Sequence, residues 1–428
     1  MVENINLSEN DIQVLRELGE WKAKASGTPE NREKIKAWQE HDEGVKGSRV
    51  MVRAETWYTT DPEHTVNETD LKCRHPWARR LERDFRFRKH EIEILKDDSF
   101  VLPFAEYHSN IERSDFGLPS SLRRKAENDL AFNYTPVLTK LDDRDFKKIR
   151  HTTLKWNKEE EESEKATLEK VFKGILKVRR RSGIWIPTTS TCLNFVGLEG
   201  FMLLQYDNPS GLKRLMQFIT DDHLALIDFM EQNKLFELNN ESDYIGSGCM
   251  GCSRLLPAKD YKGIARAKDL WFYCESQESV SISPEAYGEF VFPYIKALSD
   301  RFGRVYYGCC EPVDPVWPYI KNMKNLKRLS VSPWADEEKV GRICRENKLV
   351  YSRKMSPNYF MGEKLKEEEV RRSAEKTVNS AAGASLEFIL RDVYTLGNEP
   401  ERFVRWVEIV REAGQGTRYR VKGQGTKY

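Results

Sequence analysis

The fold is decided by residues 270–310, in which two apolar runs flank an amphipathic stretch. Leu270–Cys274 reads Leu-Trp-Phe-Tyr-Cys, and Val305–Cys310 reads Val-Tyr-Tyr-Gly-Cys-Cys. Short runs of this kind, rich in aromatic and β-branched residues, are typical of buried strands. Between them, apolar residues recur at helical spacing over Glu285–Phe302, which predicts a helix with one buried face. A strand, a helix and a second strand in this order indicate parallel strands.

The same alternation extends in both directions along the chain. Amphipathic stretches such as Leu212–Phe229 separate further strand-like runs. The predicted strands are Val50–Trp57, Phe100–Tyr107, Ile184–Thr189, Leu235–Asn240, Leu270–Cys274, Val305–Cys310, Leu329–Ser332, Leu349–Ser352 and Leu386–Leu390. This repetition predicts an α/β protein with a parallel sheet. Eight such units close into a TIM (β/α)8 barrel, and one extra run is read as an insertion.

The two ends of the chain differ from this pattern. Ser8 and Thr28-Pro29-Glu30 are helix-start signals, so residues 1–45 are predicted to form an N-terminal helical extension packed outside the main domain. The barrel domain is expected to span residues 46–412. Residues 413–428 are Gly-rich and basic and are predicted to be a flexible tail. The charge runs Glu159–Glu162 and Arg179–Arg181 are interpreted as solvated helix surface.

Composition narrows the functional classes. Among 428 residues, 70 Lys and Arg face 68 Asp and Glu, a net charge of +2. A nucleic-acid-binding protein of this size usually shows a basic excess, so nucleic acid is not the expected partner. No stretch approaches the ~18 uninterrupted apolar residues of a membrane span, and the N-terminus carries no secretory signal. A cytoplasmic enzyme that acts on small molecules is therefore expected.

In a barrel, the chemistry lies where strands end and loops begin. Reading each predicted strand to its carboxyl end gives residues that are polar or aromatic where the strand bodies are apolar. Among them we expect substrate to bind at Trp57, Asn239, Ser332 and Trp334, and Trp271, within the run Leu270–Cys274, is expected to add aromatic lining to the same pocket. Arg353-Lys354 would hold a carboxylate or phosphate, or else form an ion pair that closes the barrel mouth. Asp392, at the end of the last predicted strand, would likewise either act in the site or form an ion pair at the barrel mouth.

The sharpest local feature is Tyr306–Pro312, which places two thiols and a carboxyl group at one strand end. A thiolate is both a zinc ligand and a nucleophile. Neighbouring residues of a strand point in opposite directions, so at most one of Cys309 and Cys310 faces the barrel axis. Glu311 would serve as a ligand or as an acid/base. The alternative is that two small buried residues simply end the strand.

A second group of thiols lies in Gly246–Cys252, which contains Cys249-x-x-Cys252. Together with Cys309-Cys310 it would make a four-cysteine zinc site. The preferred interpretation is a Gly-rich active-site loop whose thiols are incidental. Among the histidines, His108 follows a strand end directly and is the best candidate ligand, beside Glu106.

The order of these motifs is similar to that of a known family. Ser281–Tyr294 resembles a segment of the uroporphyrinogen decarboxylase superfamily. Later stretches look like its uroporphyrinogen decarboxylase-like branch, namely Tyr307–Pro312, Ser330–Asp336, Tyr351–Lys354, Arg391–Thr395 and Arg405–Ile409. The resemblance covers about residues 45–412 and is specific from residue 240 onward. It implies a TIM barrel and one of two chemistries, cofactor-free decarboxylation or zinc-dependent methyl transfer that involves a corrinoid protein.

This sequence departs from both family patterns. The arginine-rich motif of the decarboxylases is not visible at Arg53–Trp57. The thiol methyltransferases carry His-x-Cys where this chain has Tyr307-Gly308-Cys309, and a second Cys where it has Arg391-Asp392. Only one cysteine at the right strand end therefore matches. The resemblance leaves the zinc ligands open as Cys309 or Cys310 with Glu106, His108, Glu311 or Asp392.

Three hypotheses follow from the sequence. In the first, the protein is a methyltransferase that uses zinc to move a methyl group between a small methylated substrate and a corrinoid protein. In the second, it is a metal-free lyase in which Arg353 and Lys354 hold substrate carboxylates while Glu311 or Asp392 handles protons. In the third, it is a non-catalytic binding barrel. Relatives in the superfamily include dimers, which implies a homodimer.

Overall fold

The computed structural model describes residues 5–56, 66–118, 122–124, 132–181, 183–241, 243–397 and 399–423. Trp57, a predicted substrate-binding residue, lies outside these ranges. Within them, no helix is sufficiently long and apolar to span a membrane.

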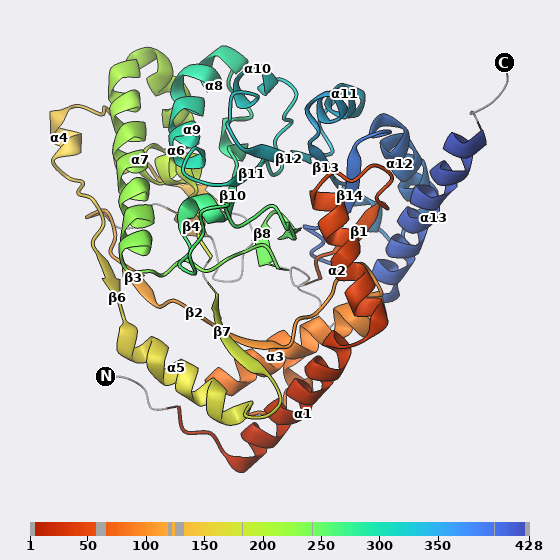
Figure 1. The fold of residues 1–428 in the computed structure, drawn as a ribbon. Helices are drawn as coiled ribbons and strands as arrows, with labels where there is room; N and C mark the ends of the chain where they lie inside the picture. The colour runs from red at the N-terminus through yellow and green to blue at the C-terminus, as the bar shows by residue number, and fades with distance from the viewer. Residues whose placement is uncertain are drawn as a thin grey trace.

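A six-stranded parallel sheet forms the centre of the molecule (Figure 1). Its strands, in spatial order, are β1 (Met51–Ala54), β14 (Ser385–Leu390), β13 (Val350–Lys354), β12 (Leu326–Val331), β11 (Arg304–Tyr307) and β10 (Trp271–Cys274). All five neighbouring pairs are parallel. The predicted α/β class and parallel sheet are confirmed. β2 (Phe104–His108) and β7 (Lys177–Arg181) form a separate parallel pair, so the closed eight-stranded barrel stays a prediction.

Two predicted strands do not form. After Ile184 the chain is irregular, and α6 (Thr188–Asp207) begins directly after Pro187, whose missing N–H suits a helix start rather than a strand ladder. Residues 235–240 are also irregular. There the side chain of Asn239 takes the place of a backbone ladder, since its amide donates to the carbonyl of Trp271 at 2.9 Å and accepts from the Trp271 N–H at 2.8 Å.

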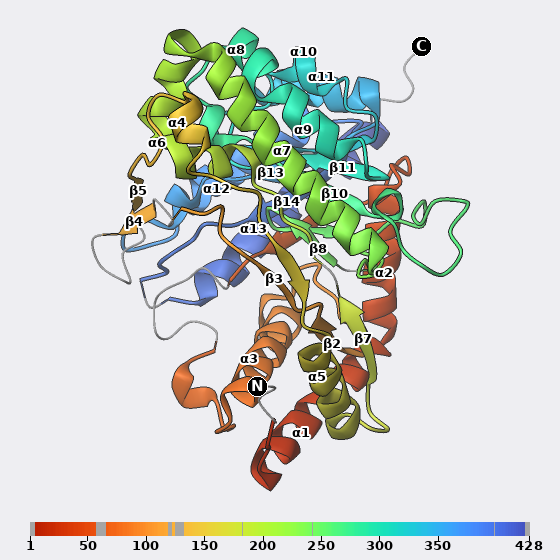
Figure 2. The same cartoon turned by 90° about the vertical axis from the view of Figure 1, so that its left-hand side faces the viewer.

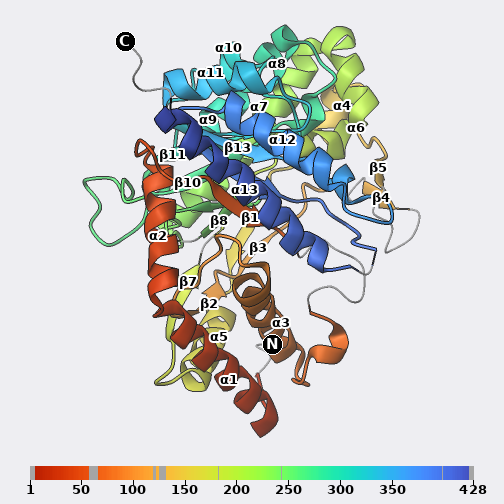
Figure 3. The ribbon, with the colours of Figure 1, turned by 90° about the vertical axis from the view of Figure 1, so that its right-hand side faces the viewer.

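The helices that connect the strands pack back onto the sheet. α9 (Phe292–Ser299) contacts β10, α11 (Glu337–Asn347) contacts β12 and β13, and α12 (Glu367–Ser380) lies beside α13 (Glu401–Gly423), which contacts β1 (Figure 3). α7 (Pro209–Gln232) packs on α6 and α9 (Figure 2). Its predicted apolar face is buried, with Leu212, Leu215, Met216 and Ile219 all 0% exposed.

The helix predicted over Glu285–Phe302 is interrupted. α8 (Pro284–Phe290) ends at Val291, whose φ of −123° is not helical, and Pro293 then occupies the first turn of α9. Proline lacks the N–H that would continue the ladder of the preceding helix, which accounts for the break.

The N-terminal helices form as predicted. The side chain of Ser8 caps α1 (Glu9–Ser26), and that of Thr28 caps α2 (Pro29–Asp42). α1 packs on α3 (Pro76–His90) and α5 (Lys158–Val171). The extension is not peripheral, however, because α2 contacts β1 and β14 and buries His41 and Asp42 beneath the sheet. At the other end, α13 continues to Gly423, past the predicted boundary at residue 412.

Shorter elements complete the described chain. The antiparallel pairs are β3 (Ile111–Arg113) with β6 (Leu154–Trp156), β4 (Leu122–Arg124) with β5 (Phe132–Tyr134), and β8 (Asp243–Gly246) with β9 (Cys249–Gly251). Short helices are α4 (Asp143–Phe146) and α10 (Trp317–Ile320), and single turns lie at Glu68–Asp70, Glu91–Leu95, Ala267–Asp269, Gln277–Ser279 and Pro357–Phe360. The β8–β9 hairpin bears directly on the site described next.

Candidate active site

A pocket of about 880 Å³ opens beside the carboxyl ends of β10, β11 and β14. Its volume is within the range of pockets that hold small molecules. Five residues that the sequence singled out line it together, namely Glu106, His108, Asn239, Trp271 and Cys309. Residues that were not selected as site residues also line it, among them Arg181, Tyr244, Tyr273, Glu275 and Arg391, of which Glu275 and Arg391 follow predicted strand ends.

The β8–β9 hairpin forms one wall of this pocket. Gly246, Ser247 and Met250 line the cavity, in agreement with the interpretation of this stretch as an active-site loop. At its tip Gly248 has a φ of +79°, and a Cβ there would lie 2.3 Å from Ile389 Cγ2, so only glycine allows the hairpin to pack on β14. Cys249 and Cys252 are buried and do not join Cys309 and Cys310 in a four-cysteine group.

Cys309, rather than Cys310, faces the pocket. Gly308, with a φ of +100°, ends β11 in a turn that L side chains rarely adopt. After this turn Cys309 is buried and lines the cavity, whereas Cys310 is exposed. The two sulfur atoms lie 3.6 Å apart, and the Cys309 sulfur also accepts a hydrogen bond from Ser247 Oγ at 3.8 Å. Of the two cysteines between which the sequence could not choose, Cys309 is therefore the one that faces the pocket.

The surroundings of Cys309 favour its thiolate form. The hydrogen bond from Cys310 lowers the pKa of the Cys309 thiol from 9.0 to about 6, against the opposing effect of burial. The positive charge of Arg391 and hydrogen bonds from Tyr273 and Ser247 act in the same direction as Cys310. Perturbed thiols of this kind are found at reactive sites.

Iodoacetamide is expected to alkylate Cys309 at a rate that rises through a pH of about 6 and then levels off, because the thiolate is the reacting form and the pKa of Cys309 is about 6. An ordinary thiol continues to gain reactivity up to a pH of about 8.5. The rate is measured by mass spectrometry at each pH. In the Cys309→Ser variant the phase near pH 6 should vanish. If it persists there, another cysteine is responsible.

Two buried carboxyl groups, those of Glu311 and Glu275, lie near the Cys309 thiol. Glu311 accepts hydrogen bonds from the N–H groups of Ser276 and Cys309, each at 2.9 Å, and so ties the ends of β10 and β11 together. Burial raises the pKa of Glu311 to about 7, and the neighbouring thiolate of Cys309 adds to this effect. Glu311 was predicted to be an acid/base or a ligand, but it does not line the pocket.

Of these two carboxyl groups, Glu275 is the one that reaches the cavity. It is 5% exposed, lines the pocket and accepts the N–H of Gln277 at 2.9 Å. Burial raises its pKa well above the usual 4.5, and the negative charges of Glu278, Glu311 and Cys309 raise it further. Glu275 follows Cys274, which pairs with Tyr307 across the sheet, so the end of β10 brings it beside the Cys309 turn. The site thus combines a carboxyl group whose surroundings favour the protonated form with a thiol whose surroundings favour the thiolate.

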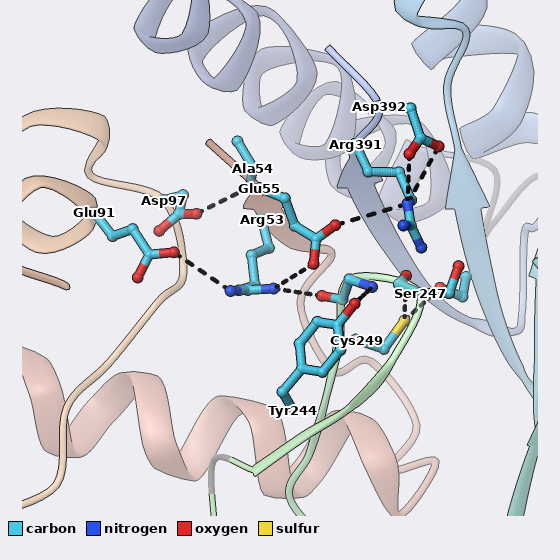
Figure 4. Close-up of polar contacts among 12 residues, drawn as sticks. Arg53, Ala54, Glu55, Glu91, Asp97, Tyr244, Ser247, Cys249, Arg391 and Asp392 are labelled. Atoms are coloured by element: carbon cyan, nitrogen blue, oxygen red, sulfur yellow. Dashed lines mark hydrogen bonds and ion pairs between the residues drawn. The ribbon is translucent and has the colours of Figure 1, made fainter. Parts of the chain in front are cut away.

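A chain of ion pairs links the hairpin to β1 and β14 (Figure 4). Glu55 is fully buried and lies 3.8 Å from Arg53 and 3.7 Å from Arg391. Arg53 in turn donates to the carbonyl of Gly248 at 2.6 Å. Arg391 also pairs with Asp392 at 3.2 Å. Asp392 was predicted as a catalytic residue or ligand, but the structure places it as a partner of Arg391 outside the pocket lining.

The two predicted substrate-binding cations lie elsewhere. Arg353 donates to the carbonyl of Ser332 at 2.6 Å and pairs with Glu337 at 3.3 Å. Lys354 points to the other face of β13, where it donates to Ser352 Oγ at 2.6 Å and to Cys249 Sγ at 3.4 Å. Neither residue lines the pocket, and each is held by protein groups away from it.

Two further predicted positions also lie away from the cavity. Ser332, directly after β12, is fully buried, and Trp334 is 72% exposed without lining the pocket. The run Arg179–Arg181, by contrast, is not helix surface. It is part of β7, and Arg181 lines the pocket, where it pairs with Glu106 at 2.8 Å and with Asp243.

The predicted zinc ligands do not assemble into a site. A catalytic zinc takes three protein ligands. Within the described ranges, the one group of three suitable side chains at ligand spacing is His41, Asp42 and Glu387, and the predicted set of Cys309, Cys310, Glu106 and His108 forms no such group. Glu106 is instead held as a carboxylate, since Arg181, Lys22 and Arg179 lower its pKa to about 2 against the effect of burial.

The His41, Asp42 and Glu387 group does not fit a metal ion either. The guanidinium of Arg328 pairs with Asp42 and lies 3.3 Å from Glu387, and all of these side chains are 0% exposed. A positive charge therefore already occupies the space between the two carboxylates. A metal ion would have to displace it.

Comparisons with known proteins give little further information. No protein-family model matches the chain, and no curated protein matches it. Among solved structures, a methyltransferase from Methanosarcina mazei is similar with a TM-score of 0.36 and 8% sequence identity, over 60% of this chain and 63% of that one. The chain thus spans less than two thirds of that protein.

Proposed function

We propose that this protein is a methyltransferase that moves a methyl group between a small methylated substrate, such as a methoxy or thioether compound, and a corrinoid carried by a partner protein. The observation that carries the proposal is the pocket in which the buried carboxyl group of Glu275 lies beside the thiolate of Cys309. The resemblance of residues 240–412 to the uroporphyrinogen decarboxylase superfamily supports methyl transfer as the chemistry.

The proposed reaction needs an acid on the protein. When a methoxy or thioether compound loses its methyl group, the remaining oxygen or sulfur gains negative charge and requires a proton. Glu275 supplies it, since burial and the charges of Glu278, Glu311 and Cys309 raise its pKa and so favour its protonated form. The corrinoid of the partner supplies the centre that accepts the methyl group.

The remaining lining accounts for binding. Trp185, Trp271 and Tyr273 present aromatic surface to the cavity, which suits the apolar part of a methylated compound. Arg181 and Arg391 line the cavity but are paired with carboxylates. A carboxylated substrate would have to compete for them, so the alternative of a metal-free lyase has less support.

Zinc was predicted to activate the leaving group as a Lewis acid. Because the described residues do not offer three ligands around Cys309, we assign that activation to the proton of Glu275. Treatment with a chelator is therefore expected to leave the activity unchanged. Loss of activity on chelation, with recovery on addition of zinc, would restore the zinc mechanism.

The direct test uses the purified full chain with methoxylated aromatic compounds and thioethers, and with reduced free cobalamin as methyl acceptor. Demethylated product that forms only when cobalamin is present is the expected result, detected by mass spectrometry. Release of carbon dioxide from carboxylated compounds without cobalamin would instead identify a lyase. No product from any of these compounds would count against both functions.

A further inference from the structure

The two adjacent thiols of Cys309 and Cys310 differ in their surroundings. Their sulfur atoms lie 3.6 Å apart, already in contact. Cys309 lines the pocket, and Cys310 is exposed, whereas the other cysteines, Cys73, Cys192, Cys249, Cys252, Cys274 and Cys344, are all buried. An oxidant in solution can therefore reach this pair and no other thiol of the chain without opening the fold.

The local charges favour oxidation at Cys309 first. Its sulfur accepts a hydrogen bond from Ser247 Oγ at 3.8 Å and shares the pocket lining with the guanidinium of Arg391. Both groups stabilise an anionic sulfur, which is the form that peroxides attack. Cys310 then lies in position to act as the resolving thiol, because redox-sensitive cysteines are commonly placed next to one.

We propose that Cys309 and Cys310 form a site of reversible oxidative modification, in which a hydroperoxide converts the two neighbouring thiols into a disulfide. The proposal goes beyond the methyl transfer proposed above and does not depend on it. The fact that carries it is the contact between a pocket-facing sulfur and an exposed one on consecutive residues.

The Cys309 thiolate attacks one oxygen of the peroxide, the O–O bond breaks, hydroxide leaves and the sulfur becomes a sulfenic acid. The Cys310 thiol then attacks this sulfur, a water molecule leaves and the S–S bond forms. Two electrons pass from the sulfurs to the peroxide. The sulfurs must approach from 3.6 Å to about 2.05 Å. Because the Cα atoms of consecutive residues lie about 3.8 Å apart, closer than in most disulfides, the backbone between the two cysteines must distort as the bond forms. A dithiol reductant reverses the change.

Disulfide formation would alter the pocket. The Cys309 sulfur would lose its negative charge, and with it one of the charges that keep Glu275 protonated. In the reduced protein the Cys309 thiolate and the protonated form of Glu275 are both available for chemistry in the pocket. In the oxidised protein neither is.

The test treats the full chain with hydrogen peroxide, blocks free thiols with iodoacetamide and digests with trypsin. Cleavage after Arg304 and Lys321 gives the peptide Val305–Lys321, which contains Cys309 and Cys310 and no other cysteine. The expected peptide is unalkylated and lighter by two hydrogen atoms than the reduced form. Addition of dithiothreitol before alkylation should return it to the doubly alkylated form.

Two variants separate the roles of the thiols. In Cys310→Ser, the light peptide should be absent and dimedone should trap a sulfenic acid at Cys309. Cys344→Ser, at a buried cysteine outside the site, should behave like the unmodified chain. The proposal is overturned if both thiols remain alkylatable after peroxide treatment, or if Cys310 is oxidised equally fast in Cys309→Ser. The readout is a mass, so it does not depend on any enzymatic activity.

Discussion

Replacing Glu275 with glutamine is expected to lower kcat for demethylation by about 100- to 10,000-fold, the usual contribution of a positioned general acid. Glutamine keeps the size of the side chain and its hydrogen bond from the Gln277 N–H, but it has no proton of suitable acidity to give. KM should change little, because the substrate would still fit the pocket. Steady-state rates with the best methylated substrate measure both constants.

The pH profile gives a second readout of the same group. The pKa of Glu275 is raised and its protonated form is the active one, so kcat/KM should fall as the pH rises through that pKa. The Glu275→Gln variant should lack this fall. Replacing Cys309 with serine removes one of the negative charges that raise the pKa of Glu275, so the fall should move to lower pH.

Glu285→Gln provides the matched control. Glu285 lies in the first turn of α8 and does not line the pocket. Its replacement changes the same chemical group and should leave kcat within about twofold of the original, as for surface substitutions in general. Equal losses in the two variants would mean that Glu275 acts through folding. Full activity in Glu275→Gln would remove it from the mechanism.

The sequence predicted the six strands of the central sheet, but it also predicted two strands that do not form. All six strands of the central sheet fall within or beside predicted runs, because short apolar runs between amphipathic helices are a strong signal. The prediction failed at Leu235–Asn240 and Ile184–Thr189. In the first case a side chain, Asn239, makes the contacts of a ladder, and in the second a helix begins early. Neither event leaves a signal in the periodicity.

The sequence predicted only part of the site, because it shows where strands end but not how side chains pair in the fold. Reading strands to their carboxyl ends brought Cys309, His108 and Glu106 to one pocket. It could not rank Glu275, whose pKa depends on burial and on three negative charges from other parts of the chain. It also misplaced Arg353 and Lys354, because the sequence does not show which partners already satisfy a cation at a strand end.

Beneath the pocket, a buried network of charges joins the N-terminal extension to the central sheet. Arg328 on β12 pairs with Asp42 at the end of α2 and with Glu387 on β14. It also donates to the carbonyl of Met250 at 3.0 Å, and its guanidinium lies 5.2 Å from the centre of the Trp271 ring. His41 contacts Glu387 at 3.1 Å. One arginine thus satisfies groups from three separate segments.

The Arg328→Met variant is expected to lose about 3–5 kcal/mol of unfolding free energy, the usual result of removing one partner of a buried ion pair. Methionine retains much of the packing, but Asp42 and Glu387 are left without their cation in a region from which water is excluded. Denaturant unfolding followed by circular dichroism measures the loss. Arg254→Met is the control, since Arg254 forms an exposed pair with Glu43 at the end of the same helix. Its loss should be far smaller.

The effect of pH distinguishes this electrostatic cause from simple loss of packing. In the unmodified chain the charge of Arg328 lowers the pKa of Glu387 against the effect of burial, so the pairing contributes stability above the ordinary carboxyl pKa of about 4.3, and this contribution is lost as the pH falls. Without Arg328, burial raises the pKa of both carboxyl groups, and protonation relieves the unpaired charge. The difference between Arg328→Met and the unmodified chain should therefore shrink as the pH falls from 7 toward about 5. A difference that stays constant over this range would show that Arg328 acts through packing alone.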